Sequence, residues 1–227
     1  AIRSVLAATA ASALLTGTAA CGLGGDTAGA ASAQGDTVNI GVLYPKTGQY
    51  AEYGRLFKQG LDLAVEEVNE SGGVGGKTLG LKYFDTQSDP KQDASVAPKL
   101  ASDPSVIAVV GDYASPASAA ASPTFQQAGL VHYGFNNSSP TFTQTGDHVW
   151  SPAIGTDSYE RVYADAAAKK AKKISVVYIE NDWGKQAFEY FKEQAARNGT
   201  QIVYESSYLP DSTDLSPILI PARDADP

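Results

Sequence analysis

From residue 38 onwards, short apolar runs alternate with amphipathic segments, and this alternation limits the folds open to the chain more than any other feature. An apolar run of about four to eight residues is typical of a strand that is buried on both faces of a parallel sheet. We expect such strands at residues 38–44, 79–83, 106–110, 130–135, 174–179 and 202–204, with a further edge strand at 148–151.

Amphipathic segments that are typical of helices fill the intervals between these runs. After the first run, Phe57, Leu61 and Val65 recur at the spacing of one helix face, and Gly72-Gly73 ends the segment. Later helices are expected to begin at residues 88–90, 115–116, 159, 184 and 213, and Pro221 is expected to break the last of them early.

Repeated strand–helix units of this length predict an α/β protein with doubly wound parallel sheets. Residues 151–157 lie between two sets of units and are the natural domain crossover. We therefore expect a first α/β lobe at residues 38–153 and a second at 154–227. The pattern stops without a closing strand or tail, so the second lobe is expected to be truncated in this chain.

The N-terminal residues are typical of a secreted, tethered protein. Residues 4–20 form an uncharged, small-residue run that suits the apolar part of a signal peptide, and residues 18–21, Thr-Ala-Ala-Cys, resemble the bacterial lipobox that ends in a lipidated cysteine. The alternative is a free Cys21 beside an ordinary cleavage site. We favour a signal peptide over residues 1–21 with a lipid anchor at Cys21, because residues 22–37 are typical of a flexible linker.

Composition excludes several classes of function. The 17 Lys and Arg against 25 Asp and Glu leave a formal net charge of −8, which is unfavourable for binding nucleic acid. One cysteine and two histidines provide no disulfide framework and little material for a metal centre. The sequence shows no Ser–His–Asp or Cys–His set and no phosphate-binding loop, so we expect no metal, no cofactor and no catalytic residue.

The candidate binding loops follow from sheet geometry. In an open α/β sheet, ligands bind beyond the carboxyl ends of the strands. This rule selects residues 45–54, 111–116, 135–140 and 180–184, which are rich in Ser, Thr, Asn and aromatic residues.

Polar candidates lie in two of these loops. Ser115 opens a helix whose first N–H groups would attract a carboxylate, although it could also be an ordinary N-cap. Asn136 and Ser138 offer further donors after the neighbouring strand, and their alternative interpretation is a polar turn before Pro140. Asp112, beside Tyr113, is interpreted as a solvated charge rather than a ligand contact.

Aromatic residues provide a second set of candidates. Tyr50, Tyr53 and Trp183 fall in loops rather than on a helical stripe, and we place Tyr53 and Trp183 in the cleft because each immediately precedes a glycine expected to open a helix. His132 and His148 are interpreted as structural residues.

Asp89 is interpreted as a helix cap beside Pro90 rather than as a partner of Asp85 in a metal or acid–base site.

An ordered set of motifs resembles the branched-chain amino-acid (Leu/Ile/Val) binding protein family of ABC transporters, which has the periplasmic-binding-protein type I fold. The motifs are Ile-Gly-Val-Leu-Tyr-Pro-Lys-Thr-Gly at 40–48, Tyr-Gly at 53–54, residues 60–69 and 72–77, Asp-Thr-Gln-Ser-Asp-Pro at 85–90, Val-Val-Gly at 109–111, Asn-Asp-Trp-Gly at 181–184, Thr-Asp-Leu-Ser at 213–216 and Ala-Asp-Pro at 225–227.

The resemblance implies two α/β lobes joined by a hinge, with a ligand enclosed in the cleft between them. It implies that Ser115 holds a ligand carboxylate, that Asn136 and Ser138 add polar contacts, and that Tyr53 and Trp183 contribute one aromatic ring from each lobe. The sites chosen from sheet geometry and those implied by the family therefore coincide.

The resemblance also implies a function. The expected protein is a non-enzymatic, extracytoplasmic, lipid-anchored solute-binding protein that delivers a small amino acid, amide or related carboxylate to an ABC permease. A ligand-sensing domain of a receptor or regulator is the alternative, because such domains share this fold. A doubly wound α/β enzyme is a weaker alternative, since it would need a nucleophile or a phosphate loop.

Overall fold

The computed structural model describes residues 36–227. The predicted signal peptide, Cys21 and nearly all of the predicted linker lie outside the described residues. The elements run in the order β1 (Thr37–Tyr44), α1 (Ala51–Glu70), β2 (Thr78–Asp85), α2 (Pro90–Ala101), β3 (Val106–Val110), α3 (Ser115–Ala128), β4 (Val131–Tyr133), α4 (Pro140–Thr143), β5 (Val149–Trp150), α5 (Thr156–Ala168), β6 (Lys173–Ile179), α6 (Asp182–Arg197), β7 (Gln201–Tyr208) and α7 (Ser216–Asp224).

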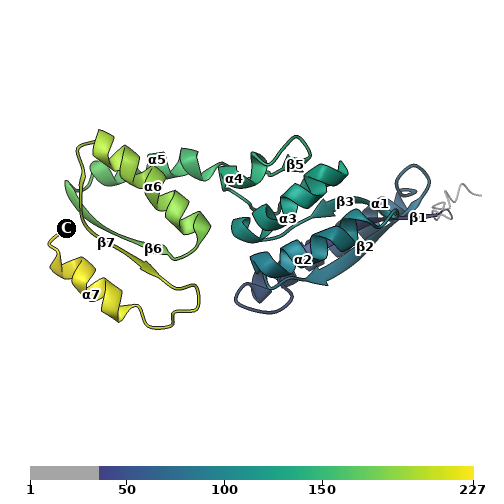
Figure 1. Ribbon diagram of the computed structural model, residues 1–227, viewed down its shortest axis with the longest axis horizontal. Coiled ribbons are helices and arrows are strands. Elements are labelled where there is room, and N and C mark those ends of the chain that lie inside the picture. The colour runs from purple at the N-terminus through teal and green to yellow at the C-terminus, as the bar shows by residue number, and fades with distance from the viewer. Residues whose placement is uncertain (1–35) are drawn as a thin grey trace, which may run out of the picture.

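The strands form two separate parallel sheets, as the alternation predicts. The first sheet has the order β2-β1-β3-β4-β5, and the second pairs β6 with β7. Figure 1 shows the two sheets with their helices as two bodies side by side, with α6 and α7 on opposite sides of the second sheet. The α/β fold with parallel sheets is therefore confirmed, whereas the exact lobe boundary between Ala153 and Ile154 stays a prediction.

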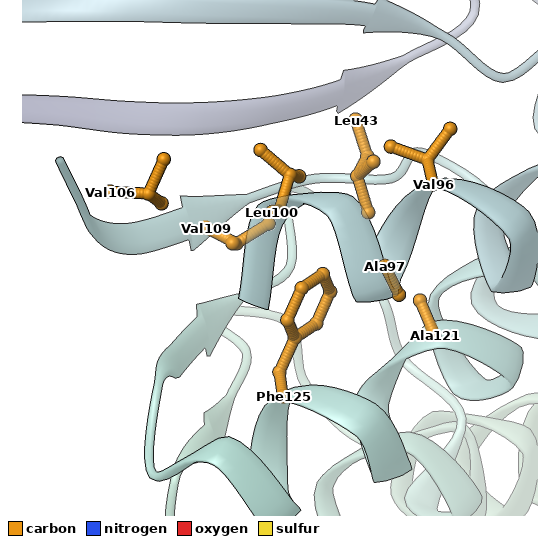
Figure 2. Packing of buried hydrophobic residues seen from close by; sticks show 8 residues of the cluster. All are labelled: Leu43, Val96, Ala97, Leu100, Val106, Val109, Ala121 and Phe125. Carbon is orange, nitrogen blue, oxygen red and sulfur yellow. The ribbon is translucent and has the colours of Figure 1, made fainter. Parts of the chain in front are cut away.

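The core of the first sheet lies between its strands and the helices α2 and α3. Figure 2 shows its members converging from these elements: Leu43, Val96, Ala97, Leu100, Val106, Val109, Ala121 and Phe125. Side chains alternate across a strand, so residues next to Leu43 face the other way. Tyr44 packs on Tyr83, whose hydroxyl donates to Asp62 of α1 at 2.6 Å, which places α1 on the opposite face of the sheet.

The strand order places a topological switch point between β1 and β3. Chain connections leave β1 towards one side of the sheet and β3 towards the other, so the loops after these two strands diverge and leave a crevice. Tyr50 follows β1 and residues 111–114 follow β3. The fold thus directs two of the predicted loops to the position where open α/β sheets bind ligands.

Helix boundaries are the part of the prediction that the structure corrects. The helices α1 and α6 begin at Ala51 and Asp182, so Tyr53 and Trp183 lie in first helical turns and not in loops. The last helix begins at Ser216 and continues through Pro221 to Asp224. A proline removes one N–H donor, and this loss near the end of a short helix does not stop it.

One short helix, α4, was not expected, and Pro140 supplies its first residue. Within residues 36–227, no helix has both the length and the apolar character that a membrane span requires.

Candidate ligand-binding site

A cleft of about 450 Å³ lies at the carboxyl ends of the strands, between the first and second sheets. On the first lobe, its walls come from the loops after β1, β3 and β4 and from the start of α3. The crossover and the elements α5, β6 and α6 provide the remaining walls. The lining residues are Tyr50, Tyr113, Ala114, Ser115, Pro116, Asn136, Ser138, Ala153, Ile154, Tyr159, Ile179, Asn181 and Trp183. The structure therefore brings four of the five predicted site residues, Ser115, Asn136, Ser138 and Trp183, to one cavity.

Ser115 is the first residue of α3 and is buried. The residue at the N-cap position is Ala114, which offers no side-chain hydrogen bond, so the interpretation of Ser115 as an N-cap is wrong. The Ser115 hydroxyl instead accepts a long hydrogen bond of 3.4 Å from the backbone N–H of Ser139. The amino end of α3, with the partial positive charge of the helix dipole, faces the cleft.

Ser138 connects the two lobes by hydrogen bonds. Its hydroxyl accepts from Trp183 Nε1 at 2.9 Å and from Thr156 Oγ1 at 2.9 Å, and it lies 3.1 Å from the Tyr159 hydroxyl. A hydroxyl has one donor and two acceptor positions, so these three partners use its whole capacity. A ligand atom would have to displace one of them to reach Ser138.

A second set of hydrogen bonds runs beside the first. Ser139 Oγ donates to Gln186 Oε1 at 2.6 Å, and Gln186 Nε2 donates to Thr141 Oγ1 at 2.9 Å. Gln186 belongs to α6, whereas Ser139 and Thr141 belong to the first lobe. The lobes are therefore held together along one side of the cleft.

Aromatic rings form the cleft wall on the side of the first lobe, but Tyr53 is not among the residues that line the cleft. Tyr113 lines the cleft, and Tyr53 stacks on it with ring centroids 4.5 Å apart. The Tyr50 ring packs on Tyr113 at 4.9 Å and also lines the cleft. Tyr53 is 48% exposed and is not among the lining residues, so a direct ligand contact by Tyr53 stays a prediction.

No Asp, Glu, Lys or Arg side chain is among the lining residues in the described part of the chain. Burial raises the pKa of Tyr113 to about 12, and it also raises the pKa of Tyr50, so both phenols stay neutral at ordinary pH. The cleft therefore combines apolar rings, neutral polar groups and the positive end of one helix dipole.

Asp112 is a correction to the sequence analysis, which interpreted it as a solvated charge. Its side chain is 0% exposed and is bound by the Thr86 and Ser88 hydroxyls and by the N–H groups of Tyr113 and Ala114. Local sequence gives no sign of this burial, because the hydroxyl donors come from a loop 24 to 26 residues away.

Several lining residues were not selected from the sequence. Tyr159 and Asn181 come from the second lobe, and Ile154 comes from the crossover. Asn181 caps α6 by accepting from the Gly184 N–H at 2.8 Å, and the Asn-Asp-Trp-Gly motif could have indicated this role. Tyr159 sits where the helix pattern alone predicts only packing.

Two polar residues away from the cleft, Asp89 and His132, each contact a structural partner. Asp89 caps α2, accepting from the N–H groups of Lys91 and Gln92, which confirms its expected role. His132 is buried, its Nε2 lies 2.5 Å from the Gly111 carbonyl oxygen, and burial lowers its pKa to about 4. Among residues 36–227, no group of three or more His, Cys, Asp or Glu is placed to hold a metal ion.

Comparisons with known proteins agree on one family. Residues 37–227 match the family described as periplasmic binding protein. A Leu/Ile/Val-binding protein homologue from Brucella melitensis is 30% identical over 202 residues, covering 88% of this chain and 55% of the relative. An amino acid binding protein from Pseudomonas aeruginosa is 30% identical over 172 residues, covering 74% and 46% respectively. The chain thus spans about half the length of the relatives it matches.

Solved structures give the same answer. A branched-chain amino acid transporter substrate-binding protein from Streptococcus pneumoniae, in complex with isoleucine, superimposes with a TM-score of 0.75 at 26% identity, covering 83% of this chain and 54% of that one. An ABC transporter solute-binding protein from R. palustris, in complex with 4-hydroxybenzoate, has a TM-score of 0.75 at 26% identity, with coverage of 84% and 52%. The match over residues 37–227 and these likenesses show that the chain belongs to the periplasmic binding protein family.

Proposed function

We propose that this protein is the solute-binding component of an ABC importer, which captures a small carboxylate-bearing or amide-bearing solute between its lobes and delivers it to a membrane permease. The observation that carries the proposal is the position of the cleft. It lies at the switch point of the first sheet, and both lobes contribute to its lining.

The chemistry of the lining supports an anionic or polar head and an apolar body in the solute. The amino end of α3, with Ser115 at its first position, suits a carboxylate. The rings of Tyr50, Tyr113 and Trp183 suit an apolar or aromatic body. Isoleucine and 4-hydroxybenzoate, the ligands in two similar structures, both combine a polar head with an apolar or aromatic body.

The proposed mechanism is binding without a chemical step. A solute that contacts Ser115 on one lobe and Trp183 on the other stabilises the closed arrangement relative to an open one. The interlobe hydrogen bonds of Ser138 and Gln186 support this closed arrangement on one side of the cleft. Closure presents a defined surface to the permease and keeps the solute out of water.

The location proposed for the protein is outside the cytoplasm. Its family membership supports an extracytoplasmic binding protein, and the sequence at residues 18–21 supports lipidation of Cys21. The lipid would hold the protein near its permease, and residues 22–37 would act as the linker.

Calorimetric titration of the full-length protein tests this function. The panel comprises isoleucine, a short-chain amide and 4-hydroxybenzoate, with melting temperature as a second readout. We expect saturable binding of at least one solute and a melting temperature that rises with its concentration, because a ligand stabilises the state that binds it. A protein that neither binds nor is stabilised by any panel member would contradict the proposal.

A further inference from the structure

The carboxylate of Asp112 lies directly behind the cleft wall and organises it. It is 0% exposed and accepts hydrogen bonds from the Thr86 and Ser88 hydroxyls and from the backbone N–H groups of Tyr113 and Ala114. The carboxylate therefore receives four hydrogen bonds, three at Oδ1 and one at Oδ2. It ties the loop after β2 to the loop after β3.

The same residue fixes the start of α3. The Asp112 backbone N–H donates to Ser118 Oγ at 2.8 Å, and Ser118 lies in the first turn of α3. The next three residues, Tyr113, Ala114 and Ser115, all line the cleft. Any reorganisation of the Asp112 side chain would therefore move the segment that we expect to hold the solute.

A second carboxyl group, Asp93 of α2, is buried near this one, and the Thr86 hydroxyl, which donates to Asp112, is also a neighbour of Asp93. Asp93 is 0% exposed, and both of its carboxyl oxygens lack a hydrogen-bond partner. Burying an ionised carboxylate without a partner destabilises the folded state far more than burying the same group in its neutral, protonated form. Burial and then the neighbouring charge of Asp112 raise the pKa of Asp93 to about 9, against the lowering effect of the Thr86 hydroxyl.

The surrounding elements offer Asp93 no compensating positive charge. Asp89, at the cap of the same helix, raises its pKa further. The packed helix α3 carries no ionisable side chain along its whole length. Asp85 faces the N–H groups of Lys46 and Thr47, and His132, on the other side of Gly111, is neutral.

The two acids differ in their surroundings. Burial raises the pKa of Asp112 as well, but the Ser88 and Thr86 hydroxyls and the Ala114 and Tyr113 N–H groups oppose that rise. A pair of interacting carboxyl groups in unlike environments divides its protons unequally. Asp112, with four donors, is the side chain suited to the charge, and Asp93, with only the shared Thr86 hydroxyl near it, is suited to the proton.

We propose that Asp112 is a positioning residue that holds residues 113–115 in the geometry of the cleft wall, and that Asp93 retains its proton so that the pair carries a single negative charge. Ionisation of Asp93 would place a second charge beside Asp112 and loosen its hold on the Tyr113 and Ala114 N–H groups. The consequence for solute affinity rests on the proposed function, whereas the protonation and the loop geometry do not.

Carbon-13 NMR of the aspartate carboxyl groups in the full-length protein, with backbone amide resonances recorded across the same pH range, tests the proposal. We expect one carboxyl group to remain protonated at neutral pH and to titrate near pH 9, and its signal to vanish in Asp93→Asn but persist in the control Asp89→Asn. The amide resonances of Tyr113 and Ala114 should shift with the same titration in the wild type and stay constant in Asp93→Asn.

Stability provides an independent pH profile. The folded pKa of Asp93 is raised from 3.8 to about 9, so the folded chain binds more protons than the unfolded chain between these values. The contribution of this group to stability is therefore complete below about pH 4 and declines as the pH rises towards 9. Urea unfolding of Asp93→Asn should lack this decline, because asparagine does not ionise.

The outcomes separate this proposal from the transport function. In Asp112→Asn, the amide protons of Tyr113 and Ala114 should exchange about tenfold faster or more, since a neutral amide oxygen is a weaker acceptor than the carboxylate oxygen that it replaces. Three results would each overturn the inference. They are an Asp93 carboxyl group that is ionised at neutral pH, a cation bound there in place of the proton, and Tyr113 and Ala114 resonances that do not change as Asp93 titrates. A protonated Asp93 in a protein that binds no solute would contradict only the proposed function.

Discussion

At the residue scale, Ser115 and Trp183 are the side chains whose removal should weaken solute binding. Ser115→Ala and Trp183→Ala should each cost about 1–3 kcal/mol of binding free energy if both contact the solute, and calorimetry on the full-length protein measures this cost. Ser122→Ala is the matched control, because it removes a hydroxyl two turns further along α3, bonded to Thr145 and outside the cleft lining. Unchanged affinity in both cleft variants would move the site elsewhere.

Single residues were predictable where a general rule of sheet geometry applied to them. Ser115, Asn136 and Trp183 follow strands at their carboxyl ends, and all three line the cleft. Asp112 was not predictable, because a loop aspartate is usually solvated and the donors that bury this one come from another loop. Tyr53 was placed on the cleft surface, and in the structure its ring stacks on Tyr113, which lines the cleft.

At the element scale, the two lobes use the same device where a strand turns into a helix. A Cβ atom on Gly54 would meet the Pro45 carbonyl oxygen at 2.0 Å, and one on Gly184 would meet the Ile179 carbonyl oxygen at 2.1 Å. Each glycine lies in the first turn of its helix and lets that turn approach the end of the preceding strand. The close approach of α6 to β6 places Trp183 at the cleft, and that of α1 to β1 holds the loop that carries Tyr50.

Alanine substitution tests this device by stability. Gly54→Ala should destabilise the protein by about 1–3 kcal/mol, the usual cost of forcing atoms into a filled space, because a backbone oxygen cannot easily yield. Gly60→Ala is the control in the same helix: a Cβ there meets nothing within 4 Å, and alanine should stabilise the helix by about 0.5–1 kcal/mol. Equal effects of the two changes on denaturant unfolding would refute the packing argument.

Elements were predicted well where the apolar pattern determines them, and poorly at their ends. Strand β3 is a continuous apolar run and β1 is a mostly apolar one, and both match the expected ranges closely. Helix starts depend on capping contacts of a few residues, so α6 begins at Asp182, after the Asn181 cap, and not at Gly184. Pro221 lies within α7, because tertiary packing of a short helix tolerates one lost hydrogen bond.

At the scale of the whole molecule, sequence alternation was sufficient to predict two parallel sheets, but not how they meet. The contacts of Ser138 with Trp183 and of Gln186 with Ser139 and Thr141 join residues about 45 positions apart, and no local pattern encodes them. The cleft lies between the two sheets, and residues of both lobes line it.

The central claim is that a solute is held between the amino end of α3 and Trp183. A crystal structure of the full-length protein with the solute identified by titration tests it most directly. We predict solute density in contact with Ser115 on one side and the Trp183 ring on the other, with the lobes closed around it. Density at any other position, with the cleft between the sheets filled only by water, would contradict the account.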